Sequence, residues 1–320
     1  MDHILVPLDG SASAECVLPH AIAIAQIFDA GITLAHILDQ PGASLRLPNA
    51  DPIDWHLKKL AAGQYLEVIK ARLEEHGLSV KTILLEGRVT EQIVKLTQAS
   101  RPDLLILSGY GETGKHGGFV SSVTQQILQY IQVSTLIIRE DLSAGSNMNA
   151  IRYQRVLVPL DGSQRAGVAL SIAEVITTVH QAELRLVYVV VQPEVARHMP
   201  LNQEEADMVD RFVEINQDAG GKYLKQIASR LPVTVRTSTL VSNNIAVTLQ
   251  NYMEQEQIDL LIMSAHGYSG EAKWPYGSVT DRFITNTTIP LLIVQDQPQQ
   301  SSEPVPTSIT TRQPARQKVM

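Results

Sequence analysis

Two copies of one domain-sized unit make up most of the sequence, and this duplication constrains the fold more than any other feature. The hexapeptide Val-Pro-Leu-Asp-Gly-Ser at residues 6–11 recurs unchanged at residues 158–163, an offset of 152. The run at residues 103–108 recurs at residues 259–264 with one change, at an offset of 156. Solenoid repeats recur every ~20–50 residues, so landmarks repeated in the same order at this long period indicate a duplicated domain.

Apolar runs alternate with segments of helical periodicity in both copies. The expected strands are residues 4–8, 31–38, 80–85, 103–107 and 135–138, then 155–160, 184–191, 233–240, 259–263 and 291–294. The expected helices of the first copy are residues 13–28, 55–76, 90–99 and 122–131. Strands separated by helices pair in parallel through right-handed crossovers. The sequence therefore predicts an α/β protein with two tandem, doubly wound, open Rossmann-like sheets of five mainly parallel strands, which bind ligands at the carboxyl ends of the strands.

Composition shifts give the expected domain organisation. We expect a first domain at 1–140, a small polar linker at 141–150, a second domain at 151–296 and a tail at 297–320. The tail is rich in Pro, Gln and Ser, which predicts disorder. Its cations Arg312, Arg316 and Lys318 suit an acidic partner. The alternative, which we favour because small charge clusters usually bind nothing specific, is a merely solvated tail.

Length and charge exclude several classes of protein. The 320 residues suggest two domains of ~150. The net charge of -7 and pI near 5.7 argue against a nucleic-acid-binding surface. A single cysteine, Cys16, excludes an intramolecular disulfide and a cysteine-rich metal site. The first residues run straight into a strand, and no apolar run is long enough to span a bilayer. We expect a cytoplasmic protein with neither nucleic acid nor membrane as a partner.

A glycine-bearing loop follows the apolar run at residues 259–263. It contains Gly267 and, after nine further residues, Gly277 and Ser278, where a helical pattern begins. The free amides and positive dipole end of such a helix suit an anion. Gly277 would let a phosphate approach the backbone, and the hydroxyls of Ser278 and Thr280 would add donors. The alternative is a loop that ends in an ordinary helix cap.

The hexapeptide at the first strand and the Gly-x9-Gly-Ser spacing after the fourth resemble the universal stress protein family. The resemblance covers about residues 1–140 and 151–296. It implies strand order 3-2-1-4-5, docking of the two domains through their last strands as a pseudo-dimer, and, in the ATP-binding branch, a Gly-x2-Gly-x9-Gly-Ser/Thr loop. The second copy departs from that loop only at Ser264, whereas the first has Ser108 and Ser121 at two of its three glycine positions.

The resemblance also implies a site for ATP or a related adenine nucleotide, with or without Mg²⁺. In the second copy, the residues it places around the base and ribose are Pro159, Leu160, Asp161 and Val189. Those it places around the ribose and phosphates are Met263, Ser264, Gly267, Gly277, Ser278, Val279 and Thr280. The corresponding weaker site of the first copy comprises Asp9, Ile37, Ser108, Gly111, Ser122 and Thr124.

We expect the two sites to differ in affinity. A serine where the loop needs a positive φ costs of order 1–3 kcal/mol of strain, and its Cβ blocks the close approach that glycine allows. The prediction is one nucleotide per chain, held by the second copy, with the first empty or weaker by at least ~1.4 kcal/mol, a tenfold ratio. Against it stands Gly87, because glycine-opened turns at that place occur in the family and the second copy has Ser242 there instead.

Several residues have two interpretations. Asp161 could bond the nucleoside, or it or Ser163 could cap the next helix; for Asp9 we favour the cap. His266 could reach a phosphate or serve only in packing. The stretch at residues 274–276 predicts a hydrophobic lid more than a base-stacking platform. Residues 109–116 resemble a phosphate-binding P-loop but are one residue short, and we favour a mobile loop.

Three functions are compatible with these features. The leading hypothesis is a nucleotide-responsive regulatory module of the stress response. The second is an interaction scaffold of the same fold that has lost its nucleotide, motivated by the serines at glycine positions. A slow ATPase is the least favoured, because we identify no general base or catalytic set. Beyond the docking of the two copies, association of two chains into a homodimer and an unidentified protein partner are further expectations.

Overall fold

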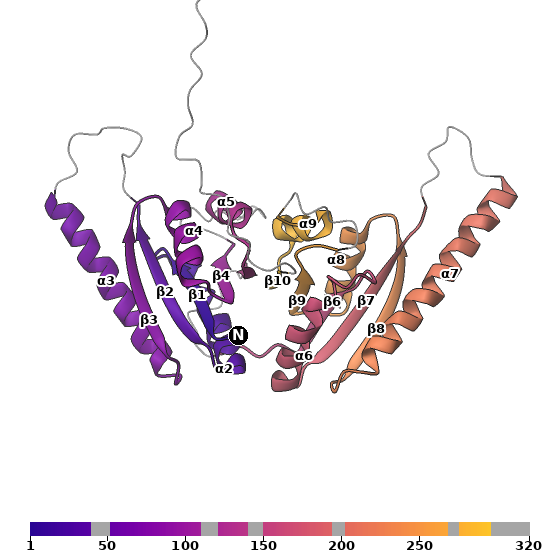
Figure 1. Cartoon of the computed structure of the whole chain (residues 1–320), viewed down its shortest axis with the longest axis horizontal. Coiled ribbons are helices and arrows are strands. Elements are labelled where there is room, and N and C mark those ends of the chain that lie inside the picture. Colours follow the sequence, from indigo (N-terminus) through magenta and orange to yellow (C-terminus); the bar gives the residue numbers. More distant parts are fainter. Residues whose placement is uncertain (40–51, 110–120, 140–149, 194–201, 268–274, 296–320) are drawn as a thin grey trace, which may run out of the picture.

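The computed structural model describes residues 1–39, 52–109, 121–139, 150–193, 202–267 and 275–295. Gly111, almost all of the P-loop-like stretch and the tail lie outside these ranges. The expected linker also lies almost wholly outside them, so the domain boundaries stay predictions. The described strands form one ten-stranded sheet in the order β3-β2-β1-β4-β5-β10-β9-β6-β7-β8 (Figure 1).

The elements follow the predicted alternation in both halves. The strands of the first half are β1 (His3–Leu8), β2 (Gly31–Leu38), β3 (Val80–Glu86), β4 (Leu104–Ser108) and β5 (Ser134–Ile138). Its helices are α1 (Ala12–Glu15), α2 (Leu18–Phe28), α3 (Pro52–Glu74), α4 (Val89–Ser100) and α5 (Ser122–Tyr130). The strands of the second half are β6 (Arg155–Pro159), β7 (Glu183–Val191), β8 (Val235–Ser242), β9 (Leu260–Ser264) and β10 (Leu291–Val294). Its helices are α6 (Val168–His180), α7 (Gln203–Ala228), α8 (Ile245–Gln255) and α9 (Ser278–Asn286).

Pairing within each half is parallel, in the order 3-2-1-4-5 that the resemblance implied. The halves join where β5 and β10 pair antiparallel, with Leu136 opposite Leu292. The predicted α/β class and the docking through the last strands are therefore confirmed. The two sheets form one continuous sheet because each short, apolar edge strand supplies the hydrogen-bond partners that the other lacks.

Each face of the sheet carries its own apolar core. Alternate strand residues point to opposite faces, so Ile4 and Val6 belong to one core and Leu5 to the other. Helices α2, α3, α6 and α7 cover the first face, and α4, α5, α8 and α9 cover the second. The long helices α3 and α7 lie at the two outer ends of the molecule (Figure 1). Strands buried on both faces explain the nearly continuous apolar runs in the sequence.

Two predicted helix boundaries were wrong, and proline explains both. The single helix expected at residues 13–28 is broken into α1 and α2, because Pro19 lies in the first turn of α2 and cannot continue a preceding helix. Helix α3 begins at Pro52 rather than at residue 55. Proline is favoured at a first helical position, where its missing N–H would have no partner anyway.

Side chains also connect the halves on both faces of the sheet. Arg139, directly after β5, donates to the backbone carbonyls of Ile284, Thr285 and Thr287 at the C-terminal end of α9. On the other face, helices α2 and α6 pack together. There the Tyr153 hydroxyl lies 2.8 Å from His20 Nδ1, and the ring of Tyr153 is tilted against that of His180, with the ring centroids 5.5 Å apart. The halves therefore share buried polar contacts besides the paired strands.

Candidate functional site

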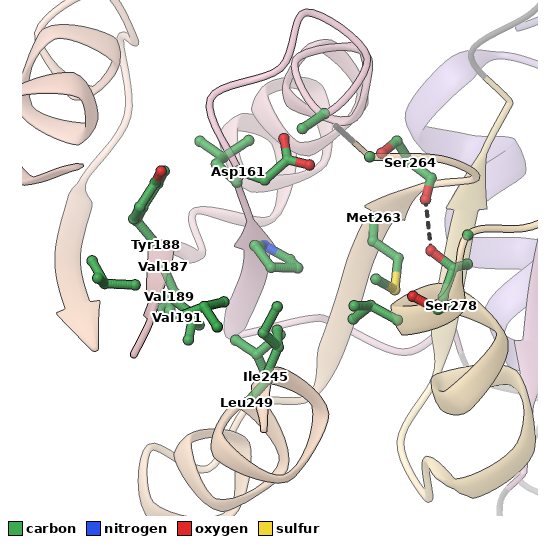
Figure 2. A pocket seen from close by; sticks show the side chains of 18 of the residues that line it. Asp161, Val187, Tyr188, Val189, Val191, Ile245, Leu249, Met263, Ser264 and Ser278 are labelled. Carbon is green, nitrogen blue, oxygen red and sulfur yellow. Dashed lines mark hydrogen bonds between the residues drawn. The ribbon is translucent and has the colours of Figure 1, made fainter. Parts of the chain in front are cut away.

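A cavity of about 710 Å³ opens at the carboxyl ends of β6, β7 and β9 (Figure 2). Its walls come from those strands, the turn after β6, and helices α7, α8 and α9. All eleven residues predicted for the second copy line it: Pro159, Leu160, Asp161, Val189, Met263, Ser264, Gly267, Gly277, Ser278, Val279 and Thr280. The structure thus brings the whole predicted set together around one space.

One wall of the cavity is an apolar slot. Val187, Val189 and Val191 project from one face of β7 toward Ile245 and Leu249 of α8 (Figure 2). The sequence analysis missed both α8 residues, together with Phe212 and Asn216 of α7. In each of these two pairs the residues are spaced i, i+4, which places them on one face of their helix. The sequence does not indicate which cavity that face lines.

On the opposite face of β7, Tyr188 lies against α7. Its ring meets Tyr223 edge-on, with the ring centroids 6.2 Å apart. A Cβ on Gly220 would come within 2.8 Å of Tyr188 Cδ1. The absence of a side chain at Gly220 therefore makes room for Tyr188 beside the cavity.

The turn after β6 explains both Asp161 and Gly267. The amide of Ser163 donates to Asp161 Oδ1 at 2.9 Å, and Ser163 Oγ accepts from the amide of Ala166 at 3.1 Å. Ser163 thus caps the turn at residues 164–167, and Asp161 in turn holds Ser163; helix α6 itself begins after Gly167 without a capping side chain, so neither Asp161 nor Ser163 caps it. A Cβ on Gly267 would collide with Asp161 Oδ2. A side chain at position 267 would therefore force the Asp161 carboxylate to move, before any ligand is considered.

Helix α9 begins at the cavity without a capping side chain. Gly277 is the N-cap residue, with extended backbone at φ -69°, and it supplies no side-chain acceptor. In the first half the equivalent Ser121 does cap: its Oγ accepts from the amide of Thr124 at 3.1 Å and bonds Thr124 Oγ1 at 2.9 Å. The amide donors at the start of the two helices therefore differ in availability.

The strain expected at Ser108, Ser121 and Ser264 is absent, so that prediction was wrong. Ser108 and Ser264 are the last residues of β4 and β9, and Ser121 has φ -57°. Among the described residues, the only non-glycine positions with positive φ are Asp29, Arg101, Gln181 and Gln257. The sequence correctly indicated that the halves differ, but the difference lies in hydrogen bonding rather than in backbone strain.

Two hydroxyls of residues expected to border the ribose and phosphates bond the protein instead. Thr280 Oγ1 donates to the carbonyl of Ser264 at 3.0 Å, and Ser264 Oγ donates to the carbonyl of His266 at 2.5 Å. Both side chains are buried, whereas Ser278 is exposed at the cavity. His266 is 5% exposed and does not line the cavity, which favours the packing interpretation.

Tyr276 brings an unpaired hydroxyl to the same side of the cavity as Gly277. It is 8% exposed, and its OH lacks a hydrogen-bond partner within the described part of the chain. Burial raises the pKa of this hydroxyl, so it remains a proton donor at neutral pH.

The first half has a counterpart cavity of about 800 Å³. Of the residues predicted there, the described ones all line it: Asp9, Ile37, Ser108, Ser122 and Thr124. Asp9 Oδ1 accepts from the amide and hydroxyl of Ser11, which caps the amide of Ala14. Asp9 thus supports the cap rather than forming it. Cavity size does not distinguish the halves.

Two kinds of site have no support in the described ranges. No group of three or more His, Cys, Asp or Glu side chains within them is placed to hold a metal ion. None of the helices in the same ranges combines the length and the apolar character needed to cross a membrane.

Comparisons with known proteins agree with this architecture. A universal stress protein of Mycolicibacterium smegmatis is 22% identical over 301 residues, covering 91% of this chain and 96% of its own. One of Methanocaldococcus jannaschii is 27% identical over 138 residues, or 43% of this chain and 81% of its own. The crystal structure of a universal stress protein from Archaeoglobus fulgidus covers 92% of this chain and 98% of its own, with a TM-score of 0.62 and 17% identity.

Another solved structure contains a bound ligand. It is a universal stress protein in complex with cAMP, 19% identical, which covers 43% of this chain and 95% of its own with a TM-score of 0.33. A sequence model of the Universal stress protein family matches this chain twice, at residues 1–139 and 152–295. The chain therefore belongs to the universal stress protein family, as a member with two tandem domains.

Proposed function

We propose that this protein binds an adenine nucleotide in the cavity of its second half and acts as a regulatory module of the stress response. The observation that carries the proposal is a single cavity that joins an apolar slot to the uncapped N-terminus of α9. Its volume of about 710 Å³ lies within the range of ~300–1,000 Å³ usual for small-molecule sites. These two ends match the two chemically different ends of a nucleotide.

The apolar slot would hold the base. Val187, Val189 and Leu249 offer aliphatic contact to both faces of a planar heterocycle, and such contact is worth ~25 cal/mol per Å² of apolar surface buried. Asp161 is the only charged side chain among the described lining residues. As a carboxylate it accepts hydrogen bonds, so it suits the amino or hydroxyl donors of a nucleoside.

The start of α9 would hold the phosphates. The amides of Ser278, Val279 and Thr280 belong to the first turn, where backbone donors have no partner within the helix. The helix dipole adds ~0.3–1 kcal/mol for an anion in such a place. The described lining offers no cation, so Mg²⁺ would enter on the phosphates rather than into a protein cage.

The same geometry gives little support to catalysis. Asp161 already accepts the hydrogen bond of its own turn, and His266 is buried away from the cavity. A fast ATPase needs a base within hydrogen-bond reach of an attacking water, and neither residue fits that role. We therefore propose binding rather than turnover. A cytoplasmic location, a homodimer and a protein partner that responds to the nucleotide belong to the same proposal.

Calorimetric titration of the intact chain with ATP, ADP, AMP and cAMP tests the proposal. Cyclic AMP is included because a family member has been solved with it. We expect one site per chain, strong loss of affinity in Gly277→Ser, and little change in the first-half variant Ser122→Ala. Gly277→Ser should fold, because a Cβ there meets its nearest atoms at 3.6 Å. If no adenine nucleotide binds at millimolar concentration, the proposal fails and the nucleotide-free scaffold is favoured.

A further inference from the structure

The first part of α7 packs little against the rest of the protein. None of residues 203–219 is buried, and the first buried residue of the helix is Gly220. In this segment Met208, Phe212 and Ile215 are 69%, 50% and 61% exposed. Their i, i+4, i+7 spacing places them in one apolar stripe along the helix. Helices in proteins are stabilised mainly by the packing of such a face, so the stripe indicates a surface that another segment covers.

A row of carboxylates runs beside this stripe. The exposed acidic residues at positions 204, 207, 214 and 218 share one side of α7, and Arg211 interrupts the row. Residues 203–218 contain six acidic side chains and one cation, a net formal charge of -5. The helix dipole accounts for acidic residues in the first turn only. Asp218 pairs with Lys222, whereas Asp210 and Glu214 form no ion pair with the residues that the structure describes.

The corresponding helix of the first half is not acidic. Residues 52–63 of α3 contain Asp54, Lys58 and Lys59, a net formal charge of +1. This part of α3 also exposes apolar side chains, those of Ile53, Leu57 and Leu60. The negative surface is therefore a property of α7 and not of the duplicated fold.

A segment of opposite charge follows β10 in the sequence. Residues 304–320 contain no acidic side chain and three cations, Arg312, Arg316 and Lys318. Strands β6, β7, β9 and β10 run parallel, so the chain leaves β10 at the edge of the sheet where β7 ends and from which α7 starts. The strands β10 and β8 are four positions apart, about 19 Å. The connecting residues 296–311 can span up to ~55 Å when extended, which is enough to reach α7.

We propose that the basic segment of residues 304–320 docks on the acidic, apolar-striped face of α7 in the same chain. The cations of the segment pair with the carboxylate row, and its apolar residues, such as Ile309, cover the stripe. This replaces the merely solvated tail that the sequence favoured, because α7 supplies an acidic surface within the same molecule.

Charge also argues against the other occupants of this face. The α7 face of a second copy would bring one strongly negative surface against another, and an anionic membrane would do the same. Phe212 also lines the cavity of the second half, so the docked segment lies beside that cavity. The inference does not depend on the nucleotide proposed there.

Hydrogen exchange of the full chain, followed by mass spectrometry, tests the docking. At an effective concentration of ~1 mM, a contact with a Kd of ~0.1 mM holds the segment docked about 90% of the time and slows exchange in residues 209–219 about tenfold. The triple variant Arg312→Glu/Arg316→Glu/Lys318→Glu should lose that protection. The matched control Arg312→Lys/Arg316→Lys should keep it, and α3 should exchange equally in all variants. Raising NaCl to ~0.5 M should remove most of the difference.

A charge swap tests whether α7 is the partner. Asp207→Lys/Glu214→Lys should remove the protection in a chain with the natural segment and restore it in a chain with the reversed segment. Met208→Ala/Ile215→Ala keeps good helix formers and should weaken the protection by loss of apolar contact. Far-ultraviolet circular dichroism establishes that each variant is folded, and the variants of the segment leave α7 itself unchanged.

Carbodiimide cross-linking of mixed unlabelled and ¹⁵N-labelled chains identifies the occupant. We expect cross-links between Lys318 and carboxylates of α7 within single chains. Cross-links that join labelled to unlabelled chains would show that a second copy occupies the face, and would overturn docking within one chain. Equal protection of α7 in the wild type and the reversed-segment variant, or no restoration in the folded charge swap, would also overturn the inference.

Discussion

Replacing Arg139 by methionine tests how strongly the first half stabilises the helix that begins the proposed nucleotide site. Arg139 is 5% exposed, and its guanidinium bonds three carbonyls at the end of α9, including that of Thr287 at 2.7 Å and that of Thr285 at 3.0 Å. The last carbonyls of a helix have no partner within it, and a cation there also opposes the negative end of the dipole.

The expected loss follows from these bonds. Methionine keeps most of the buried stem and removes only the guanidinium. A hydrogen bond to a charged group contributes ~1.5–3 kcal/mol, and three bonds from one group are not additive, so counting two at the lower value gives about 3 kcal/mol. We expect Arg139→Met to lower the free energy of unfolding by about that amount. Arg139→Lys should lose less, because an ammonium can still bond one carbonyl.

Urea unfolding followed by circular dichroism measures this loss, with Arg211→Met on the exposed side of α7 as the control, expected within ~0.5 kcal/mol of wild type. A loss below ~0.5 kcal/mol in Arg139→Met would refute the reasoning.

Gly109 gives a second check, because a Cβ there would lie 2.5 Å from Arg139 Cγ. Gly109→Ala should cost ~1–3 kcal/mol alone and almost nothing in an Arg139→Ala background.

Two further predictions concern protonation and packing. Burial lowers the pKa of His180 below its usual 6.5, and its Nδ1 accepts from the amide of Tyr153, so the folded state holds it neutral. The unfolded state then binds more protons than the folded state. The stability that depends on neutral His180 should therefore be fully present above about pH 6.5, and the free energy of unfolding should fall as the pH is lowered below that value. His180→Gln should reduce that fall between pH 7.5 and 5.5, and an unchanged slope would contradict this. Gly220→Ala should destabilise by ~1–3 kcal/mol through its clash with Tyr188, whereas Tyr188→Ala should remove that cost, and an equal cost in both backgrounds would argue against the clash.

The sequence was most informative where a local pattern decides the structure. Parallel strands buried on both faces have nearly continuous apolar sequences, so their positions could be predicted. The repeated hexapeptide indicated that β1 and β6 are equivalent strands. The helix expected at residues 13–28 was inferred from periodicity alone, which takes no account of the break that Pro19 imposes before α2. These elements depend on neighbours close in the chain, so propensity and pattern suffice.

Contacts between distant residues could not be predicted in this way. Nothing in the sequence indicates that Gly267 lies against the carboxylate of Asp161, or that Arg139 bonds carbonyls some 146 residues away. The role of Ser121 was misjudged for a related reason. Residue type shows that a serine replaces a glycine, but only the backbone angles show that its hydroxyl caps a helix instead of straining a loop.

The central claim is that one chain holds one adenine nucleotide, with its phosphates at the start of α9. A crystal structure of the intact chain grown with ATP tests it most directly. The account predicts density for a nucleotide in the second half, with phosphate oxygens within hydrogen-bond distance of the amides of Ser278 to Thr280, and no nucleotide in the first half. Equal occupancy of both cavities, or nucleotide in the first half alone, would contradict it.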